Sequence, residues 1–186
     1  MGDSVIIGVT GYKRSGKNTV ADVLAIDYDF TLLSFAEPVY QMVFALNAFI
    51  TPGARRVQSL VEEFGWDLAK ETFPEVRRQL QAMGTECGRD LLGASIWIDT
   101  WEKSLPAESN RRIVVPDVRF PNEAERIRGL GGLIWRVTRP GTAPDGHRSE
   151  VDLDRIVPDA VLTNTGSIED LHTLARQQME TIELAV

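Results

Sequence analysis

The chain has 186 residues, of which 43% are hydrophobic and 25% charged, so it suits one globular domain with a sizeable core. A formal net charge of −7 disfavours a broad nucleic-acid-binding face, because such faces are usually basic. No apolar run approaches the roughly 18 residues that a membrane span needs. The single cysteine, Cys87, excludes an intrachain disulfide. We therefore expect a cytoplasmic protein without a nucleic-acid or membrane partner, with Cys87 as a small buried apolar residue.

The stretch from Val5 to Leu24, VIIGVTGYKRSGKNTVADVL, predicts a strand, a glycine-bounded loop and a helix. A phosphate-binding P-loop requires this order. Gly11 and Gly16 allow backbone conformations in which successive N–H groups face a phosphate, and the helix start adds partial positive charge. Lys17 is long enough to reach the outer phosphates. An ordinary glycine-rich turn is the competing interpretation, which the combination of strand, loop and lysine disfavours.

Position 18 departs from the P-loop pattern G-x-x-x-x-G-K-[ST]. Asn18 stands where the pattern has a hydroxyl residue, and Thr19 follows it. The hydroxyl that normally binds Mg²⁺ is therefore missing from its usual position. Two replacements stay open: Asn18 acting through a metal-bound water, or Thr19.

The rest of the chain alternates strands and helices. Strands are expected at 31–35, 112–117, 133–137 and 160–163. Helices are expected at 39–50, 54–72, 74–92, 94–104, 121–130 and after Ser167, where Asp170 completes a pattern resembling a capping box. The residues from 140 to 158 show no period and predict a long loop or lid. This alternation predicts a five-stranded, mostly parallel sheet with helices on both faces, which binds ligands at the carboxyl ends of its strands.

Apolar spacing predicts which helix faces are buried. The helix over 39–50 is very apolar and is expected to be largely buried, as core or as a dimer interface. In the helix over 54–72, we expect Val57, Leu60, Val61, Phe64 and Leu68 on one face. In the helix over 74–92, the expected core stripe is Val76, Leu80, Met83, Cys87 and Leu91. Core positions are also expected for Trp97, Trp101 and Trp135.

Charged residues follow the predicted strands. Asp117 ends an apolar strand, where a carboxylate can hold Mg²⁺ through water or polarise an attacking oxygen; the alternative is a helix-capping role before Pro121. Arg119 and Arg89 carry planar guanidinium groups suited to phosphate, although a lone arginine is more often a solvated surface charge. Three further arginines, Arg136, Arg139 and Arg148, lie in or near the predicted lid. Only one histidine, His147, lies there, which disfavours a histidine-based metal site.

Seven segments occur together in one order: GYKRSGKNTVADVL, SFAEPV, MGTECGRDLLGASIWID, PDVRFPNEAERI, IWRVTRPG, HRSEVDLD and VLTNTGSIEDL. Together they resemble the deoxynucleoside monophosphate kinases of tailed bacteriophages, over nearly the whole chain. The segments PDVRFPNEA and TECGRDLLG are more specific than the P-loop alone. The resemblance implies a three-layer P-loop NTPase fold in one kinase domain over 1–186, with a helical acceptor-binding region at about 37–105 and a lid at about 138–158.

The resemblance also implies an activity and its residues. ATP with Mg²⁺ would be the phosphoryl donor and a deoxynucleoside monophosphate the acceptor, which supplies precursors for phage DNA synthesis in the host cytoplasm. The implied ATP contacts are Gly11, Lys13, Arg14, Ser15, Gly16, Lys17, Asn18, Thr19, Arg136, Asn164 and Gly166. The implied acceptor contacts are Phe35, Glu37, Glu86, Arg89, Trp97, Asp117, Arg119 and Glu150. Lys17, Asp117, Arg119 and Arg139 would be catalytic, with Asn18 and Asp117 near the metal.

Two other functions stay open at this point. A P-loop kinase for another small metabolite, of the phosphomevalonate or dephospho-coenzyme A kinase type, fits the P-loop and lid equally. A nucleotide-binding switch without turnover is less favoured, because the chain has no N-K-x-D-type guanine motif. A homodimer is possible, through the apolar helix over 39–50.

Overall fold

The computed structural model describes residues 4–50, 55–107, 111–142 and 152–184. The chain divides into two compact units. The first, which we call the sheet unit, comprises Met1–Ser34 and Ser104–Val186; the second, the helical unit, is Phe35–Lys103. The central part of the predicted lid, 143–151, lies outside the described residues, together with Glu150 and His147.

The sheet unit is built on five parallel strands, in the order β2-β5-β1-β6-β7. The predicted five-stranded sheet is therefore confirmed, although β2 is shorter than the predicted 31–35. A run of apolar residues in the middle strands matches their burial on both faces. The strands are β1 (Val5–Thr10), β2 (Thr31–Leu32), β5 (Arg112–Val115), β6 (Leu133–Thr138) and β7 (Ala160–Thr163).

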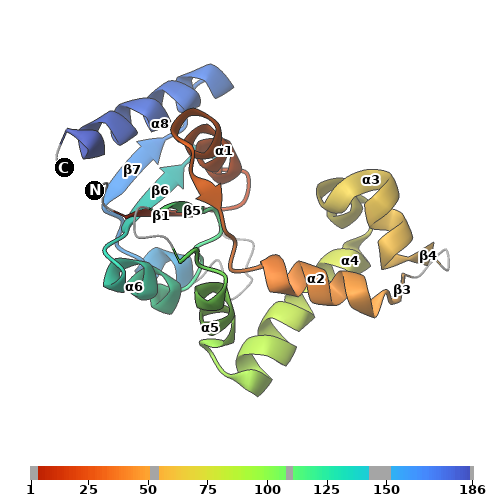
Figure 1. The fold of residues 1–186 in the computed structure, drawn as a ribbon. Coiled ribbons are helices and arrows are strands. Elements are labelled where there is room, and N and C mark those ends of the chain that lie inside the picture. The colour runs from red at the N-terminus through yellow and green to blue at the C-terminus, as the bar shows by residue number, and fades with distance from the viewer. Residues whose placement is uncertain (1–3, 51–54, 108–110, 143–151, 185–186) are drawn as a thin grey trace. The chain divides into compact units, whose positions relative to one another are not determined.

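Helices cover both faces of this sheet, which gives the three predicted layers (Figure 1). On one face lie α1 (Lys17–Tyr28) and α8 (Ile168–Glu183), packed over a core that includes Ile7 and Val9 of β1. The opposite face carries α6 (Pro121–Gly129). There Gly8 leaves room for Ile127 of α6, whose Cδ1 would lie only 2.7 Å from a Cβ at position 8.

The helical unit consists of four α-helices, one π-helix and a short hairpin in its described residues. Its core gathers Val43, Ile50, Val57, Leu60, Ala69 and Val76. The elements are α2 (Glu37–Leu46), the antiparallel pair β3 (Phe49–Ile50) and β4 (Arg55–Arg56), α3 (Val57–Thr72), α4 (Pro74–Gln81), the π-helix η1 (Ala82–Asp90) and α5 (Ile96–Lys103). In the described residues, we find no helix with the length and apolar character to cross a membrane.

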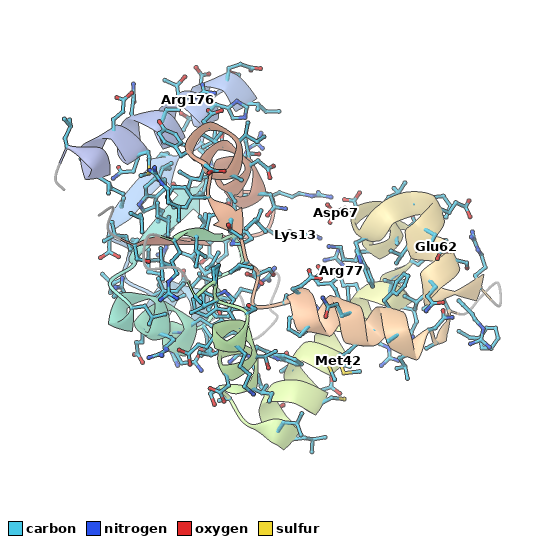
Figure 2. The ribbon with its side chains drawn as sticks, viewed as in Figure 1. Lys13, Met42, Glu62, Asp67, Arg77 and Arg176 are labelled. Carbon is cyan, nitrogen blue, oxygen red and sulfur yellow. The ribbon has the colours of Figure 1, made fainter. Side chains whose placement is uncertain are left out.

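The prediction of one buried helix over 39–50 is wrong. The helix ends at Leu46, since Asn47 takes a left-handed conformation (φ 49°) and leads into β3. Only Val39 and Val43 of α2, four residues apart, are buried. Met42 and Leu46 are 44% and 63% exposed, and Figure 2 shows Met42 on the side of α2 away from Asp67 of α3.

The predicted stripe after Pro74 is correct only in its first half. Val76 is buried, but Cys87 is exposed and Leu91 is 79% exposed. From Ala82 the chain forms the π-helix η1, whose wider turn rotates later residues away from the 3.6-residue pattern. Gly88 and Arg89 are buried in their place.

The prediction that Leu68 lies on the buried face of its helix is also wrong. It is 49% exposed, whereas its neighbour Ala69 is fully buried. The cause is a break inside α3, where Gly65 has φ 71° and ψ 165°. Residues after this break no longer continue the face on which Val57 and Leu60 lie.

The predicted N-terminal cap of α8 is confirmed. The Ser167 hydroxyl accepts a hydrogen bond from the Asp170 N–H (3.2 Å), and Asp170 Oδ2 accepts from the Ser167 N–H (2.8 Å). The hydrogen bond from the Ser167 main chain, followed by one from its hydroxyl, lowers the pKa of Asp170. The charged carboxylate is thus the form that the fold prefers.

Replacing Asp170 by Asn tests this cap. A carboxyl whose pKa is lowered by folding stabilises the protein above its unfolded pKa of about 3.9, and the stabilisation is lost as the pH falls through the folded pKa. We therefore expect D170N to lower the melting temperature at pH 7, and the difference from wild type to shrink below about pH 4. Thermal unfolding followed by circular dichroism between pH 3 and pH 8 measures this. E169Q, which removes a neighbouring charge of the same turn, controls for the helix dipole. A D170N difference that stays constant over this range would contradict the account.

Candidate active site

The loop between β1 and α1 has a backbone that only glycine fits at two positions. Gly11 has φ 143°, and a Cβ there would lie 2.2 Å from the main-chain oxygen of Val137. Gly16 has φ 107°, and a Cβ there would lie 2.6 Å from Leu171 Cδ2. Side-chain-bearing residues rarely adopt such φ values, and both positions are also crowded. Any larger residue therefore forces this loop out of its shape.

The start of α1 presents main-chain N–H groups without a side-chain cap. Gly16 is the N-cap residue and supplies no side-chain hydrogen bond, and the first turn contains no acidic residue. The first N–H groups of a helix have no partner inside it, and the helix dipole favours an anion at this end. This end of α1 is therefore suited to bind a phosphate.

Lys17 folds back over the same loop. Its Nζ donates to the main-chain oxygen of Tyr12 (2.7 Å), which also accepts from the Ser15 N–H (3.2 Å). Lys13 and Arg14 are exposed, and Arg14 has the left-handed φ of 65°. Three cationic side chains thus belong to one short loop. Their contacts with ATP stay a prediction.

Asn164 supports the loop from the end of β7. Its side chain is buried, and Nδ2 donates to the main-chain oxygen of Ser15 (2.9 Å). Its own N–H donates to Thr138 O (2.7 Å), so the residue is held between β6 and the loop. The Ser15 hydroxyl is fully buried, so a contact of Ser15 with ATP would use its main chain. Sequence reasoning proposed Asn164 as an ATP contact but missed this supporting role.

Asp117 lies just after β5 and hydrogen-bonds to the segment that follows β2. Its Oδ2 accepts a hydrogen bond from Ser34 Oγ (2.8 Å). The cap of α6 is Glu123, whose Oε2 accepts from the N–H groups of Arg119 (2.7 Å) and Phe120 (3.0 Å). These contacts thus give the capping box of α6 to Glu123, and both interpretations of Asp117 stay predictions. Glu123 was missed, because Phe120 offers none of the hydroxyl groups that mark a capping box in a sequence.

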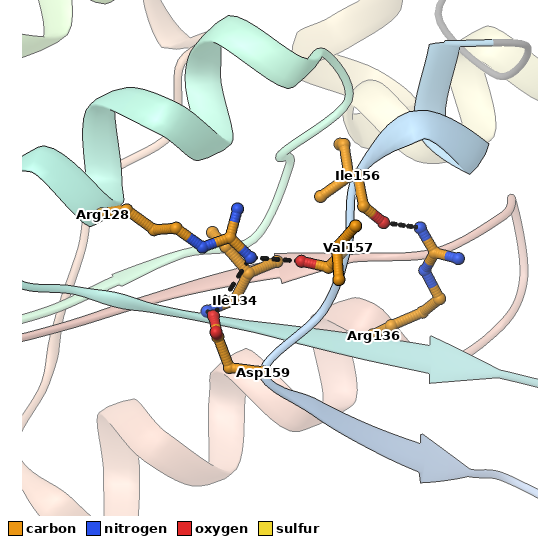
Figure 3. Close-up of polar contacts among 6 residues, drawn as sticks. All are labelled: Arg128, Ile134, Arg136, Ile156, Val157 and Asp159. Atoms are coloured by element: carbon orange, nitrogen blue, oxygen red, sulfur yellow. Dashed lines mark hydrogen bonds and ion pairs between the residues drawn. The ribbon is translucent and has the colours of Figure 1, made fainter.

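Arg136 binds main-chain oxygens at the end of the predicted lid. Its Nη2 donates to Leu153 O (2.8 Å), inside the short 3₁₀ helix η2 (Asp152–Arg155), and to Ile156 O just after this helix. Figure 3 shows the bond to Ile156. The Tyr12 hydroxyl of the phosphate loop donates to Asp154 Oδ1 in η2 (2.6 Å). The segment 153–156 is thus attached both to β6 and to the phosphate loop.

A second anchor fixes the strand that follows this segment. The Asp159 carboxylate accepts hydrogen bonds from the Ile134 N–H (2.7 Å) and from Arg128 (3.2 Å) (Figure 3). Arg128 also donates to Val157 O. These bonds set the start of β7 beside β6. Arg139, at the end of β6, is exposed.

Three aromatic side chains of the helical unit, Phe35, Trp97 and Trp101, are buried, and two of them are predicted acceptor residues. Phe35 packs on Trp101 with ring centroids 4.9 Å apart, and both are buried. Trp97 is buried and donates through Nε1 to Gly84 O (2.7 Å). The core positions expected for the three tryptophans are confirmed, including Trp135. Contacts of Phe35 and Trp97 with the acceptor stay a prediction.

Arg89 sits at the end of the π-helix η1. Its side chain is only 8% exposed, and Nη1 donates to Ala94 O (2.8 Å). A π-helix often marks a functional position, and here it turns a guanidinium inward that a regular helix would place elsewhere. Glu86 on the same element is exposed, and Glu37 of α2 accepts from Gln41 Nε2 (3.0 Å).

The oxygen donors near the phosphate loop suit Mg²⁺ that is bound partly by substrate phosphates. Those that the structure describes do not form a site in which protein side chains alone would hold a metal. The described residues contain no group of three or more His, Cys, Asp or Glu side chains that could hold a metal. Asp117 and Asn18 offer carboxylate and amide oxygens, which are hard ligands. Mg²⁺ usually binds through one or two such groups together with substrate phosphates.

Comparison with known proteins decides the family. The family model for deoxynucleotide monophosphate kinase matches residues 61–174. A protein of Acanthamoeba polyphaga mimivirus, provisionally named as a deoxynucleotide monophosphate kinase, is 34% identical over 91% of this chain and 93% of its own length. The chain belongs to the deoxynucleotide monophosphate kinase family.

Two further relatives carry the family name. The deoxynucleoside-5'-monophosphate kinase of Escherichia phage T5 is 30% identical over 70% of this chain and 74% of its own length. The deoxynucleotide monophosphate kinase of Enterobacteria phage T4 is 29% identical over 58% of this chain and 46% of its own length. The resemblance seen in the sequence is therefore confirmed.

Replacing Asn164 by Leu tests its support of the phosphate loop. The side chain keeps its bulk but loses the donor to Ser15 O, and leaving a buried carbonyl unpaired costs about 1–3 kcal/mol. We expect the substitution to destabilise the loop conformation that binds nucleotide, so that the Kd for MgATP rises roughly tenfold. Isothermal titration calorimetry with both MgATP and magnesium tripolyphosphate measures the change.

The two ligands separate support of the loop from contact with adenine. Support predicts that N164L weakens both ligands equally, because tripolyphosphate has no base. Weaker MgATP binding with unchanged tripolyphosphate binding would contradict the supporting role. The matched control is Q177L, which removes an exposed amide from α8 and should leave both affinities unchanged.

Proposed function

We propose that this protein transfers the γ-phosphoryl group of ATP to a deoxynucleoside monophosphate, giving the diphosphate and ADP. The observation that carries the proposal is the match to the family over 91% of the chain in a single relative. The glycine-bounded phosphate loop at the start of α1 supports it independently, because phosphoryl transfer needs a triphosphate site.

The sheet unit would hold the donor. The main-chain N–H groups of the loop and of the first turn of α1 would bind the phosphates of ATP. Lys17 would exchange its bond to Tyr12 O for the outer phosphates. Asn164 would keep the loop in shape through Ser15 O. When bound, Mg²⁺ neutralises phosphate charge, and Asp117 with Asn18 would hold it, in part through water.

The helical unit would bind the acceptor. Arg89, with one Nη bonded to Ala94 O, would bind the acceptor phosphate, aided by Glu86, Glu37 and the aromatic residues. An oxygen of that phosphate would attack the γ-phosphorus in line, while the bond to the β-phosphate oxygen breaks and ADP leaves. Arg119, Arg139 and Asp117 would act at the reacting groups. Orientation and charge neutralisation supply most of the catalysis in such a reaction.

The two alternatives are less well supported. A kinase for another small metabolite shares the phosphate loop, but none of the features above favours it over the family activity. A nucleotide-binding switch needs no acceptor site. A homodimer, a setting in the host-cell cytoplasm and a closing lid stay predictions.

A coupled ADP-release assay tests the proposed function. MgATP would be combined with dAMP, dCMP, dGMP, dTMP or one of the four ribonucleoside monophosphates. We expect turnover with several deoxynucleotides and little with ribonucleotides. Turnover with a phosphorylated metabolite instead, or with none of these acceptors, would overturn it.

Two substitutions test the proposed phosphate contacts. K17A and R89A should each lower kcat/KM by at least about 100-fold, comparable to losing one well-placed transition-state donor. R89K keeps the charge but loses the planar fork, so it should recover only part of the activity. Steady-state kinetics with the best deoxynucleotide measures all three variants.

The matched control is Arg176 of α8, which Figure 2 labels. Its Nε binds Asp27 (2.7 Å) in an exposed ion pair, the kind that contributes little to stability. R176A should therefore keep kcat/KM within about twofold of wild type. Near-wild-type activity of K17A or of R89A would show that the assigned contact is wrong.

A further inference from the structure

The phosphate loop contains a turn in a conformation that its sequence does not favour. The Ser15 N–H donates to Tyr12 O (3.2 Å), which closes a four-residue turn from Tyr12 to Ser15. The third residue of this turn, Arg14, has φ 65°. Turns with a positive φ at this position normally have glycine or asparagine there, because a Cβ makes the left-handed conformation costly. The turn therefore depends on support from outside the loop.

Side-chain hydrogen bonds hold both ends of this turn. At Ser15, the main-chain oxygen accepts from Asn164 Nδ2 (2.9 Å). At Tyr12, the side-chain hydroxyl donates to Asp154 Oδ1 (2.6 Å), a length typical of a hydroxyl bonded to a charged carboxylate. A strained backbone conformation persists where the surrounding structure fixes it from several sides. Here the two bonds fix the turn at its two ends.

Asp154 can hold the turn because the segment that carries it is itself fixed. We call residues 153–156, most of which form η2, the anchor segment. Arg136 of β6 donates to its first and last main-chain oxygens, Leu153 O (2.8 Å) and Ile156 O, and Figure 3 shows the second of these bonds. The Ile156 N–H donates to Leu153 O (3.1 Å), and both side chains are buried. The anchor segment therefore gives the Asp154 carboxylate a defined position.

Tyr12 also sets the position of Lys17. The main-chain oxygen that closes the turn accepts a second hydrogen bond, from Lys17 Nζ (2.7 Å). The place of this oxygen therefore decides where the ammonium lies before it exchanges the bond for the outer phosphates. One residue thus joins three parts of the site: its hydroxyl binds the anchor segment, and its main-chain oxygen binds both the turn and the lysine.

We propose that Tyr12 is a positioning residue whose bond to Asp154 keeps the strained turn, and with it Lys17, in the conformation that binds a triphosphate. This rests on the proposed function, since the ligand is the phosphoryl donor of the same site. The bond also couples phosphate binding to the order of the anchor segment. Such coupling is reciprocal, so a bound triphosphate stabilises the anchor segment in return.

Removing the bond from either side tests the proposal. Y12F keeps the ring and loses the hydroxyl, D154A removes the acceptor, and D154N keeps an uncharged oxygen acceptor. We expect Y12F and D154A each to raise the Kd of MgATP and of magnesium tripolyphosphate about three- to tenfold, and D154N to raise both less. The double variant Y12F/D154A should bind no more weakly than either single variant, because both remove the same bond. Isothermal titration calorimetry measures these constants.

Two further readouts separate positioning from a general loss of stability. R14G relieves the strain of the turn, since glycine adopts a positive φ readily, so Y12F should change the Kd of MgATP less than twofold when it is added to R14G. Hydrogen exchange followed by mass spectrometry should show that tripolyphosphate slows exchange of the Ile156 N–H in the wild type and not in Y12F. An equal effect of Y12F in both backgrounds, or equal protection in both proteins, would overturn the positioning role.

Matched controls are Y28F, which removes the hydroxyl that donates to Arg176 O (3.4 Å), and E180A, which removes an exposed carboxylate of α8. Both should leave the two Kd values unchanged. Unchanged binding in Y12F and D154A, or weaker MgATP binding with unchanged tripolyphosphate binding, would also overturn the proposal. The failure of the proposed function looks different: wild-type protein would then phosphorylate no deoxynucleotide, whereas the tripolyphosphate measurements would still decide the role of Tyr12.

Discussion

The close approach of the phosphate loop to its neighbours is the constraint on which the sheet unit depends. Gly11 lies against the Val137 carbonyl and Gly16 against Leu171, so neither position has room for a side chain. Asn164 then fills the space beneath the loop and bonds to Ser15 O. These contacts form only when the loop after β1 lies beside β6, β7 and α8 in the folded sheet unit. The packing that buries the sheet between its helices therefore also fixes the conformation of the phosphate loop.

The two units divide the proposed chemistry between them. The sheet unit offers what a triphosphate needs, namely main-chain N–H groups, a lysine and a carboxylate after β5. The helical unit offers the buried guanidinium of Arg89, which we propose binds the phosphate of the acceptor. A reaction that brings two phosphates together fits this division, because each substrate has its own set of residues.

Regular elements of this chain could be predicted from its sequence, and interruptions could not. The strands of the parallel sheet and the Ser167 cap follow from apolar runs and a local pattern. The break at Gly65 and the π-helix η1 change the direction of side chains such as Cys87 and Leu68, and no periodicity announces them. The support of Ser15 by Asn164 joins residues 149 positions apart, so only the folded chain reveals it.

Tracing the phosphoryl group itself tests the central claim most directly. ATP labelled with ³²P at the γ-position would be incubated with the protein, Mg²⁺ and one unlabelled deoxynucleoside monophosphate, and the products separated by chromatography. Our account predicts that the label moves to the deoxynucleoside diphosphate, in amounts equal to the ADP formed. Label released as inorganic phosphate, or label remaining in ATP with every acceptor, would contradict it.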